Sequence, residues 1–62
     1  MDKNAIETMD VNILLSMINM KLRDEYQSLI RLCEDWDVNE EDIINRMSKN
    51  GYEYNEQLNQ FR

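Results

Sequence analysis

Apolar residues recur at three- and four-residue steps between residues 10 and 26, which is the spacing of one face of a helix. Tyr26 continues a repeat formed by Val11, Leu14, Leu15, Ile18 and Leu22. Asp10 stands directly before this repeat, where its carboxylate can accept the free amide hydrogens of a first helical turn. The pattern predicts an amphipathic helix from Asp10 to about Tyr26, with the repeat in the core.

A second apolar set lies on the same predicted helix, beside or opposite the first, and consists of Ile13, Met17 and Met20. A helix that is apolar over more than one face is either central in its fold or shares a face with another chain. Methionine suits the second role because its flexible side chain repacks against varied surfaces. Both interpretations stay open, and these three residues form the candidate interaction face.

Two shorter helices follow, each with its own start signal. Ser28 can cap a helix that carries Leu29, Leu32, Cys33 and Trp36, and Asn39 can cap one that carries Ile43, Ile44 and Met47. The acidic residues at 40–42 favour the positive end of the last helix, and Asn50-Gly51 supplies a left-handed stop after it.

The two ends of the chain are not clearly helical. Residues 52–54 alternate aromatic and polar, and residues 60–62 can return as a second strand, so that a hairpin would lay Tyr52, Tyr54 and Phe61 on the helices. Residues 1–9 are polar, which indicates a flexible arm or a weak extra turn of helix. The predicted fold is mostly α, a three-helix, helix-turn-helix-like domain over residues 10–62 with a short C-terminal β-hairpin.

Composition limits what such a fold can do. A chain of this length buries only about 60% of the surface that it exposes when unfolded. Cys33 is the only cysteine and histidine is absent, so neither an intramolecular disulfide nor an ordinary zinc site can stabilise it. No histidine can activate Cys33, which we expect to be a buried structural residue. The sequence therefore predicts no enzyme, no cofactor, no metal and no small-molecule ligand.

Charge separates two functional hypotheses. The second and third predicted helices, with a tight link at 35–38, resemble a helix-turn-helix, and the hairpin stands where a winged form carries its wing. The chain, however, has 13 Asp and Glu against seven Lys and Arg, a formal net charge of −6. Residues 39–42 would bring three carboxylates toward DNA phosphates, which repel them. A non-catalytic protein interaction module, with a homodimer as one form, is the preferred hypothesis, and nucleic-acid binding is the alternative.

The chain shows no membrane or export segment. Its longest apolar run covers residues 13–15, whereas a helical span needs about 20 residues. The first nine residues carry Asp2 and Glu7 and lack the apolar core of a signal peptide. Together with a lone thiol, these features favour a reducing cytoplasm and no membrane partner.

Several motifs, taken in combination, resemble those of one family. They are Leu14-Leu15-Ser16, Asn19, Lys21-Leu22-Arg23-Asp24, Tyr26, Ser28-Leu29, Leu32-Cys33, Gly51-Tyr52, Tyr54 and Asn59-Gln60-Phe61. From about Asp10 onwards the chain is similar to a group of short bacterial proteins, common in gut Firmicutes, that is catalogued only as a domain of unknown function. Val11 departs from the proline usual in that family. The resemblance implies a bacterial, cytoplasmic protein and carries over no catalytic or binding residue.

Overall fold

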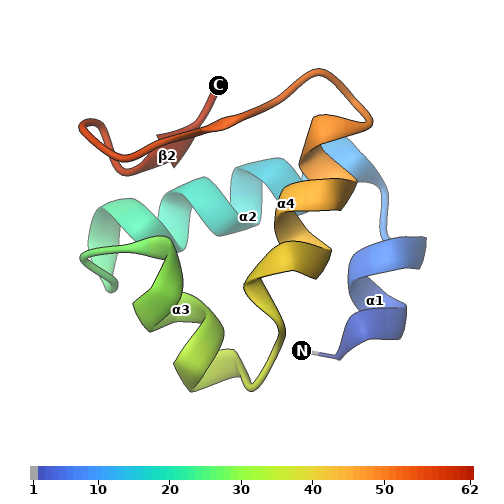
Figure 1. The fold of residues 1–62 in the computed structure, drawn as a ribbon, viewed down its shortest axis with the longest axis horizontal. Coiled ribbons are helices and arrows are strands. Elements are labelled where there is room, and N and C mark those ends of the chain that lie inside the picture. Colours follow the sequence, from blue (N-terminus) through green and yellow to red (C-terminus); the bar gives the residue numbers. More distant parts are fainter. Residues whose placement is uncertain (1) are drawn as a thin grey trace.

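The computed structural model describes residues 2–62, which form four helices and a two-stranded sheet. These are α1 (Lys3–Thr8), α2 (Val11–Asp24), α3 (Leu29–Trp36), α4 (Glu40–Ser48), β1 (Tyr54–Asn55) and β2 (Gln60–Phe61). In Figure 1, α1 lies beside α4 and the hairpin runs along α2, in agreement with the tertiary contacts. The mostly α fold with a C-terminal hairpin is confirmed, with one helix more than the sequence pattern predicted.

The additional helix, α1, occupies most of the segment for which a flexible arm was the first expectation. Asp2 caps it, and Ile6 is fully buried among side chains of the other helices. Arg46 of α4 donates from Nη2 to the backbone carbonyl of Met9 at 2.9 Å. The prediction of a flexible arm is therefore wrong for residues 2–9, and the alternative of an extra helical turn is correct. Although the segment is mostly polar, the buried side chain of Ile6 and the hydrogen bond from Arg46 attach it to the rest of the fold. Met1 lies outside the described residues.

Helix starts agree with the predicted capping residues. Asp10, Ser28 and Asn39 each accept backbone N–H hydrogen bonds in the first turn of α2, α3 and α4, respectively. These bonds satisfy amide groups that have no partner inside the helix. Gly51, with φ of +86°, makes the left-handed turn after α4. The first predicted helix ends slightly early, at Asp24 instead of about Tyr26.

One core joins all four helices to the hairpin. It consists of Ile6, Leu14, Ile18, Leu22, Leu29, Leu32, Cys33, Ile43, Met47 and Phe61. Three members of the predicted repeat on α2 are therefore buried, whereas Val11 and Leu15 are half-buried and pack against the rim of the core. Successive helical residues point about 100° apart, so a five-residue stripe places some members at its margins.

The hairpin is antiparallel, with Tyr54 opposite Phe61 and Asn55 opposite Gln60. Glu53 and Arg62 exchange two backbone hydrogen bonds of 3.0 and 2.9 Å. Bonded and non-bonded pairs alternate along an antiparallel ladder, so the backbone N–H and C=O groups of Tyr54 and Phe61 point to the two outer edges. The two rings pack together with centroids 5.4 Å apart, and Phe61 is buried, as the aromatic alternation predicted.

Candidate interaction surfaces

The structure places the three predicted interface residues in two different environments. Ile13 and Met20 are 61% and 47% exposed, and they lie seven positions apart, about two helical turns, so they share the outer side of α2. Met17 is half-buried and packs against the core. The exposed part of the predicted face is therefore Ile13 and Met20, while Met17 contributes to the fold.

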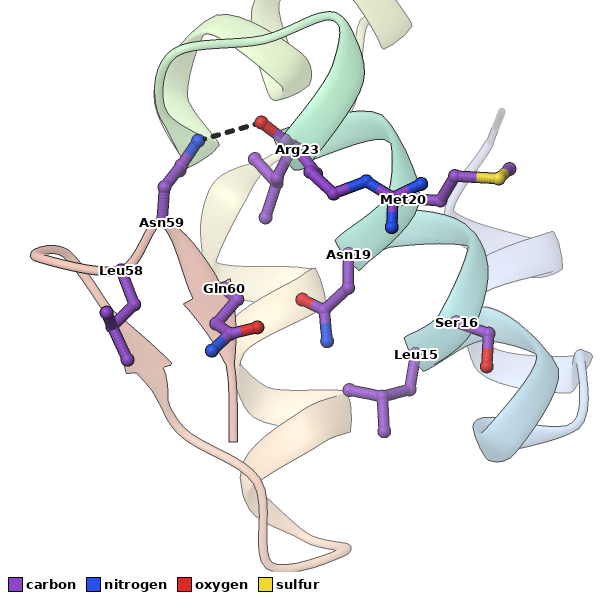
Figure 2. Close-up of a pocket in the computed structure, with 9 residues that line it drawn as sticks. Leu15, Ser16, Asn19, Met20, Arg23, Leu58, Asn59 and Gln60 are labelled. Carbon is purple, nitrogen blue, oxygen red and sulfur yellow. Dashed lines mark hydrogen bonds between the residues drawn. The ribbon is translucent and has the colours of Figure 1, made fainter.

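A groove of about 560 Å³ separates α2 from the hairpin. Figure 2 shows Leu15, Asn19, Met20 and Arg23 on its helical side, and Leu58 and Gln60 on its hairpin side. Leu58 is 51% exposed. The groove thus runs between two exposed apolar side chains, Met20 and Leu58, that come from separate elements. The sequence pattern gave no signal for Leu58, since a single leucine in a turn has no periodic partner.

The side-chain amide of Asn19 closes one edge of the sheet beside this groove. Its Nδ2 donates to the Phe61 carbonyl at 3.0 Å, and its Oδ1 accepts from the Phe61 N–H at 2.8 Å. These are the outward-pointing backbone groups of β2. Asn19 therefore occupies the position in which a third strand would pair with β2.

A second asparagine fixes the hairpin to the ends of two helices. Asn59 has a left-handed backbone with φ of +52°, and its Nδ2 donates to the carbonyls of Leu22 and Tyr26 at 3.0 and 2.9 Å (Figure 2 draws the bond to Leu22). It thereby satisfies one carbonyl in the last turn of α2 and one in the segment that follows the helix. The Tyr54 hydroxyl donates to Asn59 Oδ1 and accepts from the Leu29 N–H at 3.2 Å, at the start of α3. Hairpin, α2 and α3 are thus connected by one polar network.

The α3–α4 unit has a strongly acidic surface. A short link at residues 37–39 joins the helices, and Asp37 takes the left-handed conformation with φ of 56°. Six of the nine residues from Glu34 to Asp42 are Asp or Glu, and none is Lys or Arg. The hairpin packs mainly on α2. The residues that would approach DNA in a helix-turn-helix therefore carry negative charge.

Cys33 is buried, and burial, with a contribution from the Glu40 carboxylate, raises the pKa of its thiol to about 11. Because the thiolate is the reactive form, a pKa raised in this way disfavours reaction of Cys33 near neutral pH. Across residues 2–62, no three His, Cys, Asp or Glu side chains converge as metal ligands. Each helix in the same range is too short or too polar to cross a bilayer.

Comparison with known families identifies the domain. Residues 8–61 match the family described as "Domain of unknown function (DUF4250)". The chain belongs to the DUF4250 family. No curated protein and no solved structure matches it. The hairpin of this DUF4250 domain is anchored by Asn19, Tyr54 and Asn59, which also stand among the motifs that carried the resemblance.

Proposed function

We propose that this DUF4250 protein is a non-catalytic protein interaction module that forms a homodimer through the outer side of α2. The supporting observation is the exposure of Ile13 and Met20, at 61% and 47%, on a helix whose opposite side already fills the core. The fold does not need these side chains to be buried. Covering them on association would contribute about 25 cal/mol for each Å² of apolar surface removed from water.

The distribution of charge along α2 supports pairing with a second copy. An antiparallel contact with its two-fold axis near Ser16, midway between Ile13 and Met20, would place Ile13 of one copy against Met20 of the other. The same axis would bring Arg23, near the C-terminal end, opposite Asp10 at the N-terminal end. Arg23 already pairs with Asp24 within the monomer, so the favourable feature at both ends of the contact is the antiparallel alignment of the helix dipoles. Ser16 is small enough to let the helices approach closely.

Substitution of Met20 tests this proposal. We expect the parent protein to associate reversibly in sedimentation equilibrium, and Met20→Glu to weaken association at least about tenfold, because it places a carboxylate in an apolar contact. Ile30→Glu is the matched control, since Ile30 is similarly exposed, at 59%, but lies on α3. Circular dichroism should be unchanged in both variants. A parent protein that stays monomeric up to about 1 mM, the weakest specific range, would exclude the homodimer.

Nucleic-acid binding is the alternative function, favoured by one observation. The order of α3, a short link, α4 and a hairpin is that of a winged helix-turn-helix. The acidic segment from Glu34 to Asp42 argues against it. Titration of duplex DNA at roughly 50 and 200 mM salt separates the two functions, since phosphate contacts weaken steeply with salt and apolar contacts do not.

We place this function in the bacterial cytoplasm. Two points support that location. The sequence motifs resemble those of short bacterial proteins, and the single cysteine, Cys33, is a free thiol that a reducing compartment would preserve.

A further inference from the structure

The two outer edges of the hairpin differ in whether their backbone groups are paired. On β2, both outward-pointing groups of Phe61 are bound by Asn19. On β1, the outward-pointing N–H and C=O belong to Tyr54. No group within residues 2–62 forms a hydrogen bond with either of them. An unpaired strand edge is a template for pairing with another extended chain. One edge of this small sheet is therefore closed and the other is open.

A small pocket lies next to the open edge. Its volume is about 170 Å³, and its apolar lining comes from Leu29 and Ile30 of α3 and from Tyr54 of β1. Ile30 is 59% exposed and takes no part in the core. The pocket thus offers an apolar surface of the size of one aliphatic side chain, and Tyr54, the residue of the open edge, is part of its lining.

The pocket is also negatively charged. Glu40, at the start of α4, and Glu56, in the hairpin turn, both line it, and none of its seven lining residues is Lys or Arg. A ligand with positive charges on either side of an apolar residue would be complementary to this arrangement. An acidic ligand would be repelled.

We propose that β1 binds an extended, basic segment of a partner protein as a third strand. The backbone of the segment would pair with the N–H and C=O of Tyr54, one aliphatic side chain would enter the pocket beside Ile30, and flanking Lys or Arg residues would face Glu40 and Glu56. In strand addition of this kind, main-chain hydrogen bonds supply affinity and side-chain pockets supply specificity. The proposal rests on the interaction function argued above, but its surface differs from that of Ile13 and Met20. The homodimer or the β1 site can therefore be wrong without the other being wrong.

Hydrogen exchange on the free protein tests the difference between the edges. We expect the amide hydrogen of Tyr54 to exchange much faster than that of Phe61, because only the second is held by a hydrogen bond within the fold. Equal protection of both amides would contradict an open β1 edge and overturn the proposal.

Binding is tested with a defined probe, the peptide acetyl-Lys-Val-Lys-Leu-Lys-Val-Lys-amide. It is titrated into the Met20→Glu variant of the 62-residue chain, in which the α2 surface is blocked, and binding is followed by amide chemical shifts. We expect saturable shifts centred on Tyr54 and Ile30, slower exchange of the Tyr54 amide in the complex, and weaker binding at higher salt. Replacing every lysine of the probe by glutamate should abolish binding.

Matched variants locate the site. Ile30→Ser and Glu56→Lys should each lower the affinity for the probe at least about fivefold, which is the loss typical of a contributing interface residue. Ile13→Ser and Glu7→Lys make the same chemical changes on α2 and α1 and should leave the affinity unchanged. Binding that survives Ile30→Ser, or no binding up to about 1 mM, would overturn the proposal. If the protein self-associates and Ile30→Ser abolishes that self-association, the proposal is also overturned, because the segment bound at β1 would then belong to a second copy of this chain.

The homodimer and the β1 binding site are tested separately, so one proposal can fail while the other stands. If the probe does not bind while Met20→Glu still alters sedimentation, the strand-addition site is wrong and the homodimer stands. If the probe binds while the parent protein is monomeric, the β1 site stands and the partner is a protein other than a second copy.

Discussion

The side-chain amide of Asn19 carries one donor and one acceptor group at a fixed separation, which makes it a complement to an outward-facing residue of a strand. It binds both backbone groups of Phe61 from a position 42 residues earlier in the chain. Asn59 uses its amide in a similar way on the carbonyls of Leu22 and Tyr26. In a domain with only two residues in each strand, side chains thus perform part of the pairing that a larger sheet would perform with backbone.

Replacement of Asn19 should lower the stability of the fold. In Asn19→Leu the side chain keeps about the same size but cannot bond to Phe61, and we expect the free energy of unfolding to fall by about 1–3 kcal/mol, the cost of unmet polar groups. Urea denaturation measures this difference. Asn12→Leu is the control, because Asn12 is exposed on the same helix, and it should change stability by less than about 0.5 kcal/mol. Equal effects of the two substitutions would assign Asn19 no special role.

Among the elements, α1 shows why a short helix escapes detection from sequence. It has six residues, and only Ile6 among them is buried, so no apolar repeat can form. Its position depends on contacts with α4 that are distant in sequence, including the bond from Arg46 to Met9. This hydrogen bond gives Arg46 a structural role, since it joins α4 to the residue that follows α1.

Truncation of Ile6 tests whether α1 is part of the cooperative fold. Ile6→Ala should lower the free energy of unfolding by about 2–5 kcal/mol, as for other fully buried aliphatic residues. A domain this small can lose its fold altogether at that cost. Thermal unfolding followed by circular dichroism measures the change, and Glu7→Ala, an exposed neighbour, should have little effect. If Ile6→Ala unfolds at the same temperature as the parent, residues 3–8 are detached in solution.

At the scale of the whole molecule, features that depend on residues close together in the sequence could be predicted, whereas most features that depend on contacts between distant residues could not. The starts of α2, α3 and α4 could be predicted because a capping side chain bonds to its own first turn. Helical periodicity grouped Ile13, Met17 and Met20 but left open whether the fold buries them; the exposure of Ile13 and Met20 and the half-burial of Met17 depend on packing that periodicity does not describe. The β1 edge and its pocket were not predictable, because they bring α3, α4 and the hairpin together.

Charge is also organised at this scale. The segment from Glu34 to Asp42 holds six of the 13 acidic residues and no basic one, so the remaining seven acidic residues balance the seven basic ones. The net charge of −6 therefore equals the charge of this segment alone. Repulsion within it opposes the compact state, and salt screens that repulsion.

Removal of one charge from the segment should stabilise the fold at low salt. Asp37→Asn keeps a residue that tolerates the left-handed conformation of this link, with φ of 56°, and removes one carboxylate. In about 10 mM salt, we expect the melting temperature of the variant to exceed that of the parent protein. Near 1 M salt the two melting temperatures should become nearly equal, because charges are screened beyond about 3 Å. A difference that is independent of salt would show that repulsion is not its cause.

The bonds of Asn19 to Phe61 have a consequence for the order of folding. They close a loop of 42 residues, so they can form only after α2 has placed Asn19 on its surface. The hairpin should therefore condense last and detach first in partial opening. Each opening would release the β2 edge and bare the Phe61 ring together, which is the combination that promotes aggregation through exposed strands. The same asparagine that orders the tail should thus also oppose association through the β2 edge.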